Sequence, residues 1–187
     1  MNLPNRLTLA RIVFTALFVL CFSADFPFRF TSAFLLFALA ALTDLLDGLI
    51  ARRWNLITDF GKLMDPLADK ILTASAFVCL IQFGAIPAWA VILVISREFL
   101  ITGLRSLAAT NGFVIPADNL GKHKTTWQML TIIYFLLLLA LGEVTRLSWF
   151  EAAWVVGTHG LVPLTVILSV YSGLAYFFKN RDLIKTA

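Results

Sequence analysis

Four aspartates at helical spacing are the residues of this chain best suited to chemistry. Asp44 lies three residues before Asp47, on one face of a helix. Asp65 lies four residues before Asp69, which also places both on one face. If the two helices face each other, the carboxylates converge, and their repulsion needs cations to relieve it. Oxygen ligands alone indicate Mg²⁺ or Mn²⁺, and such sites commonly handle phosphate oxygens.

The residues between these acids favour the approach of a phosphate ligand. Gly48 and Ala51 place almost no side chain beside the carboxylates. Arg52 lies one helical turn past Gly48 and can bind a phosphate through two N–H groups. Gly61 lies four residues before Asp65 and lets the returning chain pass close to the ligand. The stretch therefore predicts a site where metal ions and an arginine bind a phosphorylated substrate.

The spacing of these residues resembles the signature of the CDP-alcohol phosphatidyltransferases, D-x2-D-G-x2-A-R-x8-G-x3-D-x3-D. All eight fixed positions are filled, by Asp44, Asp47, Gly48, Ala51, Arg52, Gly61, Asp65 and Asp69. Eight residues at fixed spacing form a specific motif, unlike a lone glycine pattern. The resemblance implies that a CDP-linked lipid gives its phosphatidyl group to an alcohol and releases CMP. The alternative is a set of surface acids, but intramembrane acids usually serve a function.

The resemblance also implies a role for each part of the motif. Two metal ions would polarise the attacked phosphorus and stabilise the CMP leaving group. The metal ligands would be Asp44, Asp47, Asp65 and Asp69. Asp69 matches the family position that takes the proton of the acceptor hydroxyl, so it is also the expected catalytic base. The residues expected to bind the CDP-lipid are Gly48, Ala51, Arg52 and Gly61, together with Asn5 and Thr8 from the N-terminus.

The composition predicts a helical protein embedded in a membrane. The 187 residues are 60% hydrophobic and 14% charged, with a mean hydropathy of +0.88. A soluble domain carries about 25% charged residues. We expect an all-α membrane protein with six transmembrane helices and one domain over residues 1–187. The six apolar runs end near residues 22, 52, 83, 108, 141 and 178.

The ends of these runs carry several local signals. Residues 2–11 predict a short interfacial segment before the first span, in which Asn5, Thr8 and Arg11 either bind the nucleotide headgroup or anchor the chain at the interface. Asp65 and Pro66 predict the cap and first turn of the third helix. Pro163 predicts a kink in the sixth run.

A second set of polar residues predicts the binding site of the acceptor alcohol. Arg97 and Arg105 are eight residues apart and share a helix face, and Lys122 and Lys124 lie at the start of the fifth run. These four cations suit a dianionic acceptor better than serine or inositol. Alternatively, Arg105 reaches the membrane surface and Arg97 pairs structurally with Glu98, although adjacent helical residues point in different directions.

Several segments resemble the bacterial phosphatidylglycerophosphate synthases, namely residues 2–11, 51–55, 96–105 and 121–125. This resemblance implies CDP-diacylglycerol as the donor and sn-glycerol 3-phosphate as the acceptor. It also implies a homodimer in the bacterial inner (plasma) membrane. A transferase for inositol phosphate, serine or another alcohol is the alternative within the family.

The distribution of Lys and Arg predicts the orientation in the membrane. Thirteen of the fifteen basic residues fall at the end of the bundle that holds the aspartates and both termini, and only Arg29 and Arg146 fall at the other end. The excess places the acids and the termini on the cytoplasmic side. A transporter or proton channel would instead need acids at mid-depth and often an inverted repeat, which the sequence lacks. An inactive scaffold would not need the complete signature.

Overall fold

The computed structural model describes residues 3–54, 59–110, 119–145 and 148–180. Within them, it describes all side chains except those of residues 3–4, 47–54, 59–60, 62–63, 119–120 and 122. Every regular element in these ranges is helical. The elements are α1 (Leu3–Ser23), α2 (Arg29–Trp54), α3 (Asp59–Ile81), α4 (Ala88–Thr110), α5 (Asn119–Val144), α6 (Phe150–Val156), the π-helical turn η1 (Gly157–Leu161) and α7 (Val162–Lys179).

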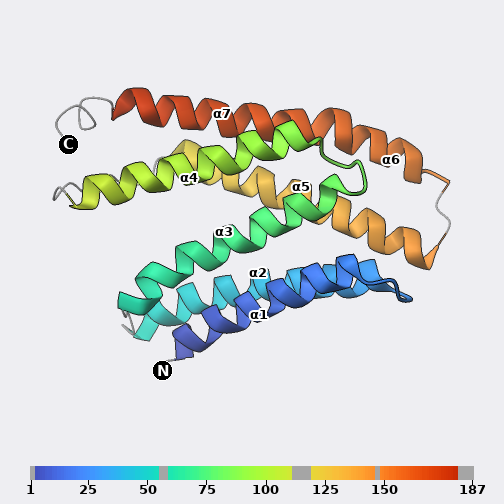
Figure 1. The fold of residues 1–187 in the computed structure, drawn as a ribbon, viewed down its shortest axis with the longest axis horizontal. Coiled ribbons are helices and arrows are strands. Elements are labelled where there is room, and N and C mark those ends of the chain that lie inside the picture. The colour runs from blue at the N-terminus through green and yellow to red at the C-terminus, as the bar shows by residue number, and fades with distance from the viewer. Residues whose placement is uncertain (1–2, 55–58, 111–118, 146–147, 181–187) are drawn as a thin grey trace.

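The helices form an antiparallel bundle in which α6, η1 and α7 follow one another as a single pass (Figure 1). α1 packs mainly on α2 and α3, while α4 packs on α7. α5 contacts both α2 and α7, and α3 contacts α4 and α5, so these two helices join the halves of the bundle. Both termini lie at the left end in Figure 1, where α2 ends and α3 begins. This end therefore collects the residues of the aspartate motif.

Aromatic side chains fill the core at the other end of α1–α3. Phe22, Phe30 and Phe83 contact one another edge to face, with ring centroids 5.0–5.5 Å apart. Phe18 and Phe37 extend this cluster and are fully buried. Such pairs contribute about 0.5–1.5 kcal/mol each beyond the area they bury. The aromatic side chains therefore pack these three helices together at the end away from the aspartates.

Many large apolar side chains point outward, as expected for a surface in contact with lipid. Leu20, Leu100 and Ile167 each expose more than three-fifths of their surface. Four helical stretches are long and apolar enough to cross a membrane, namely Asn5–Ser23, Arg29–Leu46, His123–Val144 and Phe150–Lys179. α3 and α4 are as long but carry more charge, with Asp65, Asp69 and Lys70 in α3 and Arg97, Glu98 and Arg105 in α4. Four of these six charged residues, Asp65, Asp69, Arg97 and Arg105, are predicted site residues.

Three expectations about local structure can be compared with the structure, and their outcomes differ. The expected interfacial segment has no boundary of its own within the described residues, because α1 runs without a break from Leu3 to Ser23. Pro66 lies seven residues inside α3, so Asp65 does not cap that helix. An interior proline costs about 3 kcal/mol or more, and we attribute its tolerance to the packing of α3 on α1. Pro163 lies in the first turn of α7, directly after η1, which confirms a distortion there.

Candidate active site

The polar face of α1 binds two of the motif aspartates. Arg11 Nη1 lies 2.7 Å from Asp44 Oδ1, and the Arg11 side chain is fully buried. The Thr8 hydroxyl donates a 2.6 Å hydrogen bond to Asp65 Oδ1. Asn5 is buried on the same face, because positions three apart share one side of a helix. Anchoring at the membrane interface is therefore the wrong interpretation of Asn5, Thr8 and Arg11, since all three point into the bundle.

Asp69 interacts both with another acidic residue and with basic residues. We call Asp44, Asp65 and Asp69 the aspartate cluster. Asp69 lies one turn after Asp65 on α3 and is half-buried. Its carboxylate interacts electrostatically with Asp44 and Arg11, and also with Lys124 on α5. Asp69 is thus near both acidic and basic groups.

The remaining motif residues are only partly described. The side chains of Asp47, Gly48, Ala51 and Arg52 lie outside the described residues, although their backbone belongs to the last turns of α2. Gly61 is buried in the first turn of α3. Among the side chains that the structure describes, no three His, Cys, Asp or Glu groups are close enough to hold a metal ion. The donors that are described, Asp44, Asp65 and Asp69, are carboxylates, which fit Mg²⁺ or Mn²⁺ chemically.

A polar cavity of about 450 Å³ lies between α3, α4 and α5, and Lys70, the residue after Asp69, is part of its lining. We call it the basic cavity, and its charged lining residues are Lys70, Arg97, Glu98, Arg105 and Lys124. The cavity therefore contains three of the four predicted acceptor-binding cations, while the Lys122 side chain lies outside the described residues. Four cations around one carboxylate leave an excess of positive charge, which suits an anionic ligand.

Glu98 organises the cations of the basic cavity. Its Oε1 accepts a hydrogen bond from Arg97 Nη1 at 3.1 Å. The same oxygen accepts a hydrogen bond from the Lys124 ammonium, whose side chain is almost completely buried. The expectation that Arg97 and Glu98 diverge is wrong for their charged ends, because long side chains can turn back toward each other. Arg97 is therefore both part of a structural pair and part of the cavity wall.

α7 supplies the other partners of the two arginines. Arg97 Nη2 donates to Ser172 Oγ at 3.0 Å, and Arg105 Nε donates to Tyr176 Oη at 3.1 Å. The Arg105 guanidinium also lies 5.3 Å from the centre of the Tyr176 ring. The two arginines share a face, as predicted. Arg105 does not simply extend to the membrane surface, because the buried Tyr176 holds it.

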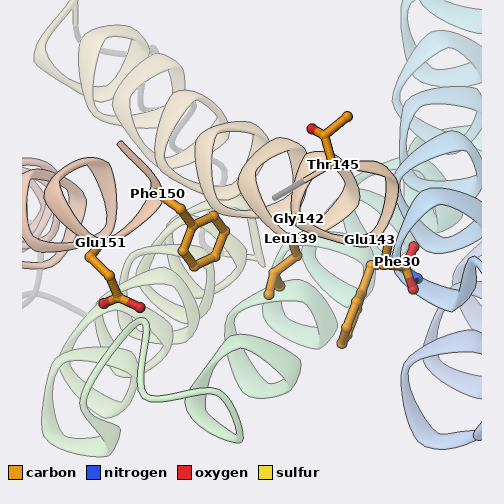
Figure 2. A pocket seen from close by; sticks show the side chains of 7 residues that line it. All are labelled: Phe30, Leu139, Gly142, Glu143, Thr145, Phe150 and Glu151. Atoms are coloured by element: carbon orange, nitrogen blue, oxygen red, sulfur yellow. Dashed lines mark hydrogen bonds between the residues drawn. The ribbon is translucent and has the colours of Figure 1, made fainter. Parts of the chain in front are cut away.

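A different cavity, of about 400 Å³, lies at the end of the bundle away from the aspartates. Figure 2 shows Glu143 beside Phe30, with Phe150 and Glu151 on the other side of the opening. Glu143 accepts hydrogen bonds from the backbone N–H groups of Phe30 and Thr31 at 2.9 and 2.8 Å. Its carboxylate therefore caps the first turn of α2. We assign Glu143 to the stability of the fold rather than to the site.

Comparisons with known proteins agree with this geometry. The family model for CDP-alcohol phosphatidyltransferase matches residues 1–171. This chain belongs to that family. A transferase from Bacillus subtilis, named CDP-diacylglycerol–glycerol-3-phosphate 3-phosphatidyltransferase, is 40% identical over 100% of this chain and 98% of its own length. A Rickettsia bellii protein of the same name is 34% identical over 94% of this chain and 93% of its own length.

A relative with a different name aligns with most of this chain. The probable phosphatidylglycerophosphate synthase of Mycobacterium tuberculosis is 40% identical over 90% of this chain and 78% of its own length. Membership of the family, together with the apolar helices, identifies the chain as an integral membrane enzyme. It also favours the transferase over the transporter and scaffold alternatives.

Sequence reasoning missed several residues of this transferase site. Lys70, Thr102 and Glu98 line the basic cavity but were not among the expected acceptor residues. The position of Lys70, directly after Asp69, was an available signal, because two consecutive charges in an apolar helix need partners. Ser172 and Tyr176 left no comparable signal, since hydroxyl groups are common in membrane helices.

Proposed function

We propose that this enzyme transfers the phosphatidyl group of CDP-diacylglycerol to sn-glycerol 3-phosphate, giving phosphatidylglycerophosphate and CMP. The observation that carries the proposal is that Asp69 interacts with one lining residue of the basic cavity and directly precedes another on α3. Lys70, the residue after Asp69, lines that cavity, and Asp69 interacts electrostatically with Lys124, which also lines it. The names of the relatives support the same reaction.

The donor side of the reaction is assigned to α1, α2 and α3. Two divalent ions, Mg²⁺ or Mn²⁺, would be held by Asp44, Asp47, Asp65 and Asp69, and would neutralise the pyrophosphate and polarise its phosphorus. Arg11 and Thr8 orient Asp44 and Asp65 through the contacts described above. The residues that would line the CDP-lipid site are Asn5, Thr8, Gly48, Ala51, Arg52 and Gly61.

The acceptor side is assigned to the basic cavity. Arg97, Arg105 and Lys124, with Lys122, would bind the phosphate of glycerol 3-phosphate and leave its hydroxyl toward Asp69. Asp69 accepts the hydroxyl proton while the alcohol oxygen forms a bond to the lipid phosphorus and the bond to CMP breaks. Arginine is suited to this task because its planar fork binds phosphate through two parallel hydrogen bonds.

The proposal includes the setting of the enzyme. The excess of Lys and Arg at the aspartate end supports an active site and termini on the cytoplasmic side of a bacterial inner membrane. CMP and glycerol 3-phosphate are water-soluble and can exchange there. We further propose a homodimer, on the basis of the family resemblance.

Release of CMP by the purified protein tests the proposed reaction. The protein in detergent receives CDP-diacylglycerol with Mg²⁺ or Mn²⁺ and, in separate assays, glycerol 3-phosphate, serine, inositol or inositol phosphate. We expect release only with glycerol 3-phosphate, and its loss on adding EDTA. Release with a different acceptor would overturn the acceptor assignment, and activity that survives EDTA would overturn the metal assignment.

A further inference from the structure

One face of α7 contacts both arginines of the basic cavity. The residues of this face are Ser172, Gly173 and Tyr176, and all three are buried. They lie beyond residue 171, where the match to the family model ends. The part of the site that handles the donor is thus within the shared family region, whereas these α7 contacts are outside it.

Gly173 leaves the space through which Arg97 passes. A Cβ atom at this position would lie 2.8 Å from Arg97 Cγ and 3.4 Å from its Nε. The first of these atoms belongs to the base of the arginine stem, so a methyl group would displace the whole side chain. At the far end of the same side chain, Arg97 Nη2 donates a 3.0 Å hydrogen bond to Ser172 Oγ. The Ser172 hydroxyl in turn donates to the Ser169 carbonyl oxygen. Arg97 is therefore located at two points by α7 and at a third by Glu98.

Tyr176 locates Arg105 in a similar way. The Tyr176 side chain is buried, with 3% of the residue exposed, so its ring has little freedom to move. Its hydroxyl accepts from Arg105 Nε, and its ring lies beneath the guanidinium. A guanidinium has five N–H donors, so this bond leaves donors that a phosphate can use. The geometry of both arginines thus depends on α7 rather than on α4 alone.

We propose that Ser172, Gly173 and Tyr176 are positioning residues that determine the specificity of this enzyme for a phosphorylated acceptor. They fix where Arg97 and Arg105 present their N–H groups to the acceptor phosphate. The inference rests on the proposed function, because it assigns the basic cavity to the acceptor. It predicts that changes in α7 alter discrimination between glycerol 3-phosphate and uncharged glycerol, without altering use of the CDP-lipid.

Gly173→Ala tests the inference, with Gly103→Ala as the matched control. A Cβ at Gly103, on α4 itself, meets nothing within 4 Å. We expect Gly173→Ala to raise the KM for glycerol 3-phosphate about tenfold, the effect of losing one good phosphate contact. The KM for CDP-diacylglycerol should remain within about twofold of wild type. The preference for glycerol 3-phosphate over glycerol should fall by a similar factor, and Gly103→Ala should change none of these values.

Tyr176→Phe provides a second test that keeps the buried ring and removes only the hydroxyl. We expect the KM for glycerol 3-phosphate to rise about threefold to tenfold, with the thermal stability in detergent close to wild type. An equal rise in both KM values, or a Gly173→Ala enzyme that behaves like Gly103→Ala, would overturn the inference. The proposed function fails separately, if wild-type protein releases no CMP with glycerol 3-phosphate.

Discussion

The aspartate cluster and the basic cavity each bring charges of one sign close together around a single opposite charge, and the signs are reversed between the two. In the aspartate cluster, two carboxylates, Asp44 and Asp69, interact with one buried cation, Arg11. In the basic cavity, several cations surround one carboxylate, Glu98. Each countercharge reduces the repulsion among its neighbours and still leaves an excess for a ligand of opposite charge. The comparison teaches that two regions of opposite charge, which we propose bind the two substrates, meet at Asp69 and Lys70.

The two halves differ in how the chain assembles them. The motif aspartates lie on consecutive helices at fixed short spacing. The arginines of the basic cavity depend on Ser172 and Tyr176, which are 75 and 71 residues away along the chain. The motif shared by the family is therefore contiguous in sequence, whereas the proposed acceptor site depends on contacts between helices that are distant in sequence. The following substitutions test this division, beginning with the largest expected effect.

Asp69→Asn should reduce turnover by about a thousandfold, because the acceptor hydroxyl loses its proton acceptor. Binding of CDP-diacylglycerol should change little, since the side chain keeps its size and one oxygen. CMP release and binding of a labelled CDP-lipid measure the two properties. Asp25→Asn is the control, because Asp25 is almost fully exposed at the other end of the bundle. Near-normal turnover of Asp69→Asn would refute its role as the base.

Arg11→Met should destabilise the protein by about 3 kcal/mol, the lower end of the range for breaking a buried ion pair. The lower end applies because the Asp44 side chain is 44% exposed. Arg29→Met removes a cation from a similar pair with Asp25, but that pair lies at the surface and should cost less than about 1 kcal/mol. Denaturation in detergent measures both. Equal losses would show that Arg11 is not the structural countercharge of the aspartate cluster.

Glu98→Gln should destabilise the protein by about 2 kcal/mol, because the buried Lys124 loses its countercharge. Lys124→Met should also destabilise it, since Glu98 then loses a partner. If the two groups form one unit, the double variant should lose at least 1 kcal/mol less than the sum of the single losses, as double-mutant cycles measure for coupled neighbours. Additive losses would refute the coupling that we assign to the basic cavity.

Arg105→Ala should raise the KM for glycerol 3-phosphate about tenfold, with a smaller effect on the KM for CDP-diacylglycerol. Arg105→Lys keeps the charge but loses the planar fork, so its effect should fall between wild type and Arg105→Ala. Steady-state kinetics with each substrate varied in turn measure the difference. Arg6→Ala, at an exposed position on α1, is the control. Equal effects on both KM values would remove Arg105 from the acceptor site.

Much of the fold follows from hydropathy, because each apolar run must form its hydrogen bonds internally in a membrane. All six expected runs are helical passes of the bundle. Their ends were less predictable. Pro66 indicated a helix start by local rules, yet α3 begins seven residues earlier. Local propensities amount to a few kcal/mol, so packing against neighbouring helices can override them.

The sequence by itself determined the chemistry of this protein, the family and the helical passes, because these depend on residue types at short spacing. Thr8, Asp65 and Asp69 are recognisable from the chain alone. Only the tertiary structure decided that Arg11 is buried against Asp44 and that α7 holds Arg97 and Arg105. Such pairings depend on which helix faces meet, and the energies that select them arise from packing over the whole bundle rather than from neighbours in sequence.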